Sequence, residues 1–180
     1  MKTKSSVYSF FLGTLLTLLG ELVLAEIPPN IILIISDDQR HDDLDGRMPN
    51  VEERIMQAGV RFMNAYVTTP ACCPSRASIL TGMYASRHRV TRNSSTLEQA
   101  TIVNHLKEAG YYTGLVGKYL NTWDGSPRPE FDYWASFPGG SAPFYNPVLN
   151  VNGKWIDAKG YITDLFEDCL LEFLARATKQ

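Results

Sequence analysis

The chain has 180 residues, 44% of them hydrophobic, and a formal net charge of −2 at pH 7. This length fits one domain with enough apolar side chain to form a core. Lys and Arg are scattered along a nearly neutral chain, so we expect no nucleic-acid partner. Three cysteines, two of them adjacent, do not make a disulfide framework.

The first 25 residues are typical of a secretory signal peptide. A basic start is followed by an apolar run over residues 10–19 and by a small residue, Ala25, at the expected cleavage position. The run is short for a membrane span, which needs about 20 apolar residues, although an uncleaved anchor is the alternative. We therefore expect residues 1–25 to be removed near Ala25, leaving a mature portion 26–180 without a stable membrane span. The protein would be secreted, periplasmic or lysosomal.

The first half of the mature chain predicts an alternation of strands and helices. The apolar run 31–35 fits a strand buried on both faces, as in parallel sheets. Its carboxyl end carries Asp37 and Asp38, where open α/β sheets place their ligands. Asn50 is a candidate cap for a helix over residues 51–58, and residues 61–67 fit a short strand or an extended segment.

The next elements surround a second group of polar residues. A helix is expected to begin near Pro74, because proline is tolerated in the first helical turn. Ser95 and Glu98 have the spacing of a capping box for a further helix that ends at Gly110. Residues 111–117 then predict a strand that leads into Lys118.

The last third of the chain changes character. Residues 124–147 are rich in Pro, Gly, Ser and aromatic residues and predict a long irregular, lid-like stretch. A hairpin turning at Asn152-Gly153 is expected next. Thr163 or Asp164 is then expected to cap a helix whose apolar face includes Leu165, Cys169, Leu170 and Phe173.

Five residues could form an anion-handling site. A cysteine at a helix N-terminus, Cys72, is favoured as a thiolate by the helix dipole, and Arg76 lies one turn further with donors suited to a tetrahedral oxyanion. Asp37 and Asp38 are hard oxygen ligands of the type that calcium or magnesium prefers. Lys118 could add a positive charge. Taken singly, each has a structural explanation: a disulfide of Cys72 with Cys169, turn-forming aspartates, or solvated surface cations.

The run Cys72-x-Pro74-Ser75-Arg76-x5-Gly82 resembles the motif of type I sulfatases. The segments around Ile31–Gln39, Pro49-Asn50, Thr68–Pro70 and Gly117-Lys118 also look like sulfatase sequence. Residues 68–93, with 117–121, are similar to the branch that contains N-acetylglucosamine-6-sulfatases and heparan-editing extracellular sulfatases. The resemblance extends from about Pro29 to the C-terminus.

The resemblance implies an α/β, alkaline-phosphatase-like fold, with a mixed, largely parallel sheet and helices on both faces, incomplete at the C-terminus. It implies that Cys72 is oxidised to formylglycine by a maturation enzyme, and that the hydrated aldehyde attacks the sulfur of a sulfated carbohydrate or other sulfate ester. Asp37, Asp38 and the modified Cys72 would bind one calcium ion. Arg76 would hold the hydrated aldehyde, and Lys118 would bind a sulfate oxygen.

The sequence also departs from the family pattern. Many sulfatases have a histidine two residues after the lysine, where this chain has Leu120. Family members are longer, and their later metal ligands, catalytic His and second Lys have no counterpart here. His88 is a candidate substrate contact, and His105 is expected on a helix face.

Three alternatives therefore stay open. The first is a catalytically incomplete sulfatase fragment, and the second is a phosphatase of the same superfamily. A cysteine-based phosphatase loop is disfavoured because it needs an arginine six residues after the cysteine, where Ser78 stands. The third, a zinc site, is the least favoured because Cys72 and Cys73 have no further ligand at zinc spacing.

Overall fold

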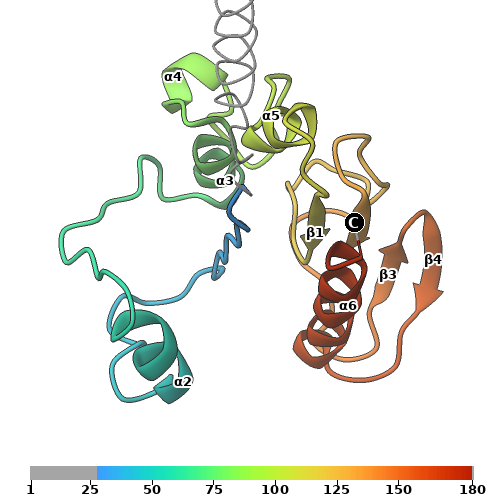
Figure 1. Ribbon diagram of the computed structural model, residues 1–180. Helices are drawn as coiled ribbons and strands as arrows, with labels where there is room; N and C mark the ends of the chain where they lie inside the picture. Colours follow the sequence, from blue (N-terminus) through green and yellow to red (C-terminus); the bar gives the residue numbers. More distant parts are fainter. Residues whose placement is uncertain (1–27, 180) are drawn as a thin grey trace, which may run out of the picture. The chain divides into compact units, whose positions relative to one another are not determined.

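The computed structural model describes residues 28–179 (Figure 1). The chain divides after Arg40 into two compact units, which are described separately. The predicted signal peptide, residues 1–25, lies outside the described residues. Among the helices of the described part, none has the length and apolar character needed to cross a bilayer.

The first unit contains the apolar run that was predicted to be a buried parallel strand, and this prediction is wrong for the described residues. Residues 28–36 have no strand assignment, and the side chains of Ile31, Ile32, Leu33 and Ile34 are exposed. A strand is defined by pairing with a neighbour, and an apolar run specifies only that its side chains favour burial.

The second unit begins with an irregular helix. A turn of α-helix, α2 (Pro49–Val51), continues into a π-helix, η1 (Glu52–Met56). The expected cap, Asn50, lies inside this helix, and the cap position is held by Met48 without a side-chain hydrogen bond. Proline fixes the first helical position because its missing N–H would be unpaired there in any case. Residues 61–67 have no strand assignment and contain a turn.

Three helices follow: α3 (Cys72–Thr81), α4 (Ala85–His88) and α5 (Ile102–Glu108). The helix expected near Pro74 is thus confirmed. The capping box of α5 is formed by Thr101 and Asn104, not by Ser95 and Glu98. The Thr101 N–H donates to Asn104 Oδ1 at 2.8 Å, whereas Ser95 closes a separate turn with Arg92. Spacing alone does not decide between two such boxes, because the backbone must leave the helix immediately before the cap.

A four-stranded sheet has the order β1-β2-β3-β4. Its strands are β1 (Gly114–Val116), β2 (Tyr133–Ser136), β3 (Val148–Val151) and β4 (Lys154–Asp157). β1 and β2 are parallel, and the other two pairs are antiparallel. The sheet is therefore mixed as predicted, but it is not largely parallel in the part of the chain described.

β2 lies within the stretch 124–147 that was predicted to be irregular. All four of its residues are buried, so it lacks the alternation of apolar and polar residues that reveals a half-exposed strand. The predicted hairpin is confirmed: Asn152 and Gly153, with φ of 51° and 87°, join β3 to β4. Asn152 also accepts the Trp134 N–H through Oδ1 at 2.9 Å and so ties the turn to β2.

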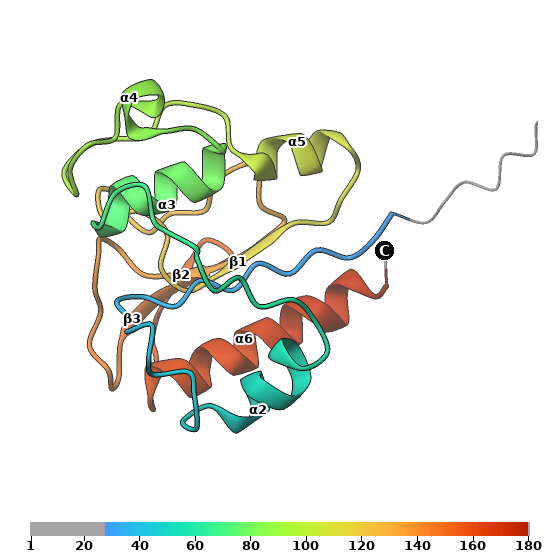
Figure 2. The ribbon, with the colours of Figure 1, turned by 90° about the vertical axis from the view of Figure 1, so that its left-hand side faces the viewer.

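The sheet carries helices on both faces, as expected (Figure 2). Trp134 of β2, paired with Leu115, belongs to a buried cluster with Cys73, Ala77 and Leu80 of α3. The neighbouring pair, Gly114 and Tyr133, points the other way and meets Phe173 of α6 (Ile162–Ala177). α6 begins after Tyr161, ahead of the expected caps Thr163 and Asp164. Alternating residues of β1 and β2 thus connect the cysteine-bearing helix to the C-terminal helix.

Candidate active site

The sulfatase-like motif forms α3, and Cys72 is its first residue. Ala71 before it is extended, with φ −145° and ψ 145°, and makes no side-chain cap. The cap comes from a distant residue: the Cys73 N–H donates to Asn93 Oδ1 at 2.9 Å. The helix ends at Gly82, whose φ of 67° is the left-handed conformation of a helix C-cap. The motif's first and last residues thus mark the two ends of one helix.

The two adjacent cysteines have different environments. Cys73 has no exposed surface, and its Sγ lies 3.6 Å from the Ser95 carbonyl oxygen, to which it donates. Desolvation by burial raises the pKa of the Cys73 thiol, so it behaves as a small core residue. Cys72 is half-buried and unpaired. Cys72, Cys73 and Cys169 are all free cysteines, so the alternative disulfide between Cys72 and Cys169 is not formed in the described structure.

Arg76 and Lys118 are brought together through the main chain. Arg76 is only 8% exposed, and its Nη1 donates to the Lys118 carbonyl oxygen at 2.7 Å. Lys118 follows Gly117, the residue after the end of β1. Gly117 has a φ of 110°, which glycine adopts without the strain that a side chain would cause. The predicted strand leading into Lys118 is confirmed in shortened form. One helical turn therefore carries Cys72 and Arg76, and Arg76 fixes the path of the segment that bears Lys118.

His88 has a structural role in the described protein. It is 1% exposed, its Nδ1 accepts the Val90 N–H at 3.0 Å, and its Nε2 lies 2.9 Å from Ser78 Oγ. Because Nδ1 is an acceptor, the neutral ring donates from Nε2 to Ser78. Thr68 also donates to Ser78 Oγ, at 2.9 Å. Both ring nitrogens are thus engaged within the protein, which speaks against the expected substrate contact. The His105 side chain is exposed on α5, and its Nδ1 lies 3.6 Å from Glu108 Oε2, as expected of a helix-face residue.

Asp37 and Asp38 occupy a bend at the end of the extended segment of the first unit. Both are exposed, and Asp38 has a left-handed φ of 53°, which aspartate tolerates better than most residues. Two consecutive carboxylates supply hard, anionic oxygens, so this donor set fits a calcium ion. Since calcium takes 6–8 oxygen ligands, the pair accounts for only part of a coordination shell.

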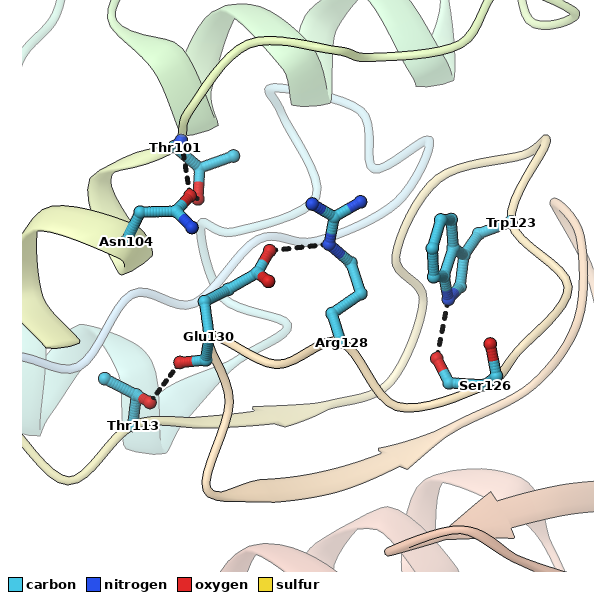
Figure 3. A network of polar contacts seen from close by, with 7 residues as sticks. All are labelled: Thr101, Asn104, Thr113, Trp123, Ser126, Arg128 and Glu130. Carbon is cyan, nitrogen blue, oxygen red and sulfur yellow. Dashed lines mark hydrogen bonds and ion pairs between the residues drawn. The ribbon is translucent and has the colours of Figure 1, made fainter.

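The segment after Lys118 forms a network that the sequence did not reveal (Figure 3). Arg128 Nε donates to Glu130 Oε1 at 2.5 Å, and its guanidinium carbon lies 4.8 Å from the Trp123 ring centre and 5.5 Å from that of Tyr119. The Thr113 hydroxyl donates to the Glu130 carbonyl oxygen at 2.6 Å. Glu130 is 4% exposed. The available signal was an arginine among aromatic residues, which form cation–π contacts.

Two hollows adjoin α3, and neither is lined by the predicted site residues. One of about 440 Å³ lies at the C-terminal end of the helix, between Met83, Gln99 and Ile102. The other, of about 210 Å³, is lined by Tyr66, Thr68, Ser75 and Ser78 together with neighbouring residues. The predicted site residues therefore lie outside these two hollows.

Comparison with known proteins defines the class. Residues 29–180 match the family model "Sulfatase", and the chain belongs to the sulfatase family. Its mixed sheet with helices on both faces is part of the sulfatase fold.

Particular relatives are extracellular or glucosamine-directed sulfatases. The putative extracellular sulfatase Sulf-1 homolog of Caenorhabditis elegans is 38% identical over 167 residues, which cover 83% of this chain and 23% of that protein. The N-acetylglucosamine-6-O-sulfatase of Bacteroides thetaiotaomicron is 35% identical, with 84% and 28% covered. Human N-acetylglucosamine-6-sulfatase is 33% identical, with 81% and 31% covered. The chain therefore spans less than a third of the length of these relatives.

A solved structure agrees with these relatives. It holds a protein in complex with its substrate, D-glucosamine-2-N,6-O-disulfate, and superposes with a TM-score of 0.57 at 37% identity. The match covers 64% of this chain and 24% of that one.

Proposed function

We propose that residues 26–180 are the nucleophile-bearing portion of a sulfatase catalytic domain that hydrolyses sulfate esters of carbohydrates. The observation that carries the proposal is the geometry of α3. Cys72 is the accessible first residue of a capped helix, and Arg76 is bound to the main chain of Lys118 one turn later. Family membership and the glucosamine disulfate bound by the similar solved protein support sulfated glucosamine as the substrate class.

In this proposal Cys72 is the residue that a maturation enzyme oxidises to formylglycine, and the modified side chain supplies the nucleophilic oxygen. The free helix amides at the start of α3 favour an anion beside it. Arg76 orients the modified side chain with a guanidinium held in place by the Lys118 carbonyl, and the Lys118 ammonium binds a sulfate oxygen. Positive charge gathered at the developing negative charge lowers the barrier to sulfuryl transfer.

Asp37 and Asp38 would supply carboxylate oxygens to a calcium ion. When bound, such an ion acts as a Lewis acid toward an anionic oxygen. The two carboxylates would also anchor the extended segment that precedes them, because a ligand that binds only the folded state stabilises it.

The proposed route to the substrate is secretion. Residues 1–25 would direct the chain out of the cytoplasm and be cleaved near Ala25, leaving no stable membrane span. This placement fits the extracellular sulfatases among the relatives and gives access to sulfated carbohydrate outside the cell.

The first test is the modification itself. The full chain is co-expressed with a formylglycine-generating enzyme, secreted, and mapped by peptide mass spectrometry. We expect the peptide that contains Cys72 to show replacement of its thiol by an aldehyde, and a Cys72→Ala variant to lose this signal. Cys73→Ala is the matched control and should retain it. Unmodified Cys72, or transfer of the modification to Cys73, would contradict the proposal.

The second test is sulfate release from 6-O-sulfated glucosamine, with an aryl sulfate and the corresponding phosphate ester as competing substrates. We expect calcium-dependent release from the sulfated sugar, and a loss of at least about 100-fold in Lys118→Ala because a charge-stabilising donor of this kind contributes 10²–10³ in rate. Faster release of phosphate would favour the phosphatase alternative. Failure to release sulfate from a chain with fully modified Cys72 would support a catalytically incomplete fragment.

A further inference from the structure

The segment that caps α3 is also an acceptor sequence for N-linked glycosylation. Asn93-Ser94-Ser95 has the pattern Asn-x-Ser with a non-proline residue in the middle. Asn93 is exposed and lies in a turn closed by the Ser95 N–H and the Arg92 carbonyl oxygen at 3.0 Å. Exposed turns are the sites where glycans are accommodated without disturbing a core.

The oxygen and the nitrogen of the Asn93 side-chain amide differ in their hydrogen bonding. Oδ1 accepts the Cys73 N–H at 2.9 Å and so satisfies one of the open amides of α3. Nδ2 has no hydrogen-bond partner within residues 28–179. Because a glycan is attached through Nδ2 and leaves the carbonyl oxygen in place, capping and glycosylation are compatible at this residue.

We propose that Asn93 carries an N-linked glycan that borders the N-terminus of α3, beside Cys72. The donor is an oligosaccharide linked to a polyisoprenoid diphosphate. Asn93 Nδ2 loses one proton to a base and forms a bond to the anomeric carbon of the first sugar. The bond from that carbon to the diphosphate oxygen breaks, and the lipid diphosphate leaves with the electron pair. This inference goes beyond the proposed hydrolase activity and depends on it only in sharing secretion.

The structure gives the proposal a physical consequence. Attachment leaves the Cys73 hydrogen bond intact, so the glycan adds bulk at the rim of the helix N-terminus without removing its cap. Substitutions can separate the two roles: Asn93→Asp keeps an oxygen acceptor and removes the attachment point. Ser95→Ala removes the acceptor pattern and leaves Asn93 unchanged.

The experiment expresses the full chain, with its own first 25 residues, in a eukaryotic secretory host, and maps it by mass spectrometry before and after peptide:N-glycanase. We expect the wild-type peptide to carry a glycan mass, and the enzyme to convert Asn93 to Asp. Ser95→Thr should remain glycosylated, whereas Ser95→Ala and Asn93→Asp should migrate like the deglycosylated wild type. Secretion with Asn93 unmodified, or retention of an unglycosylated chain in the cytosol, would overturn the proposal.

The same peptide map reports on Cys72 and so separates this inference from the proposed function. A glycan on Asn93 with unmodified Cys72 would support the glycosylation proposal and contradict the proposed sulfatase function. Modified Cys72 without a glycan on Asn93 would contradict the glycosylation proposal and support the proposed function. Thermal unfolding of the deglycosylated wild type and of Asn93→Asp should coincide, because both carry aspartate at position 93 and keep an oxygen acceptor for the Cys73 N–H. If Ser95→Ala fails to fold and Ser95→Thr folds normally, the missing glycan in Ser95→Ala would be due to misfolding. The Asn93→Asp variant would then decide whether Asn93 is the attachment site.

Discussion

At the scale of single residues, two neighbouring cysteines differ in their burial. Cys72 and Cys73 are equivalent in composition, but Cys73 lies in the core and donates to the Ser95 carbonyl oxygen, whereas Cys72 is half-buried at the helix start. Arg76, one turn along, is nearly as buried as the core residues. A buried cation is tolerated only when its donors are satisfied, and the Lys118 carbonyl oxygen satisfies one of them.

Replacing Arg76 by alanine should therefore weaken the fold as well as any activity. Loss of a hydrogen bond to a charged group, which leaves the Lys118 carbonyl without this donor, should lower the free energy of unfolding by about 1.5–3 kcal/mol. Urea denaturation monitored by tryptophan fluorescence measures this change. Arg87→Ala, at an exposed arginine, is the matched control and should stay within about 0.5 kcal/mol of wild type. An equal effect of the two substitutions would contradict the assigned role of Arg76.

The Tyr119 hydroxyl is a buried polar group without a hydrogen-bond partner among the described residues. Its removal in Tyr119→Phe should raise the free energy of unfolding by about 1 kcal/mol, because the ring keeps its contacts and a desolvated hydroxyl is lost. Desolvation raises the pKa of Tyr119 from 10.0 to about 12. Between these values only the unfolded state ionises, so wild-type stability should fall as the pH rises above 10, and Tyr119→Phe should show a smaller fall. Denaturation curves at pH 8 and pH 11 test both expectations, which a destabilised Tyr119→Phe would contradict.

At the scale of elements, α5, β1 and β2 are joined by one carboxylate. Asp132 pairs with Lys107 of α5 and accepts the Thr113 N–H at 2.9 Å just before β1. Desolvation tends to raise the pKa of Asp132, but the hydrogen bonds and charge of Lys107 and Thr113 outweigh it, and the net shift is downward from 3.8. This side chain thus connects a helix to the sheet that delivers Lys118.

The lowered pKa predicts acid sensitivity. The stabilisation from Asp132 is fully present above the unfolded pKa near 3.8 and is lost as the pH falls through the lower folded pKa. Asp132→Asn should remove this contribution, so the difference in unfolding free energy between wild type and variant should shrink from pH 7 toward pH 2. Asp157→Asn, at an exposed aspartate of β4, provides the comparison. A difference that does not vary with pH would show that Asp132 acts only by packing.

The contact between α6 and β1 depends on a glycine, Gly114, which has no side chain. A Cβ added at Gly114 would lie 2.5 Å from the Phe173 ring, which also stacks on Tyr112. Gly114→Ala should cost about 1–3 kcal/mol through overpacking. Combination with Phe173→Leu should recover part of this loss, giving a coupling energy of at least about 0.5 kcal/mol in a double-mutant cycle. Additive effects would indicate that the ring moves aside freely.

At the scale of the whole molecule, large apolar side chains are exposed in the second unit. Phe62 is 79% and Tyr66 87% exposed, and Val60, Met63 and Val67 accompany them. Exposed apolar groups that lie close together along a chain favour association in solution. We therefore expect substitutions in this region to change solubility more than the free energy of unfolding.

Substituting Phe62 and Tyr66 by serine should lower the binding of a hydrophobic dye and raise the concentration at which the protein stays monodisperse. The free energy of unfolding should change by less than about 0.5 kcal/mol, since neither side chain contributes to the core. Dye fluorescence and light scattering measure the first effect, and urea denaturation measures the second. As a control, Leu149→Ala in the buried cluster beneath α6 should cost about 2–5 kcal/mol. A similar loss in the serine variant would place Phe62 and Tyr66 in a packed environment.

The sequence by itself determined the elements whose signals are local. The helix at Cys72, the strand before Lys118 and the hairpin at Asn152-Gly153 follow from proline, glycine and apolar spacing, and the motif sufficed to indicate the family that the comparisons confirmed. The roles of Asp37, Asp38, Cys72, Arg76 and Lys118 remain predictions. Local signals work because turn and cap geometries depend on a few adjacent residues.

Tertiary structure alone decided where local signals were ambiguous or absent. In the described residues, the apolar run 31–35 has no strand partner, and β2 forms inside a stretch that was predicted to be irregular. The capping box of α5 is formed by Thr101 and not by the predicted Ser95. Tertiary structure also supplied the α3 cap from Asn93, 20 residues away, and placed the half-buried Arg128, paired with the buried Glu130, against aromatic rings. These outcomes depend on contacts between residues distant in sequence, since strand pairing, burial and the satisfaction of buried charges are decided only when the chain has folded.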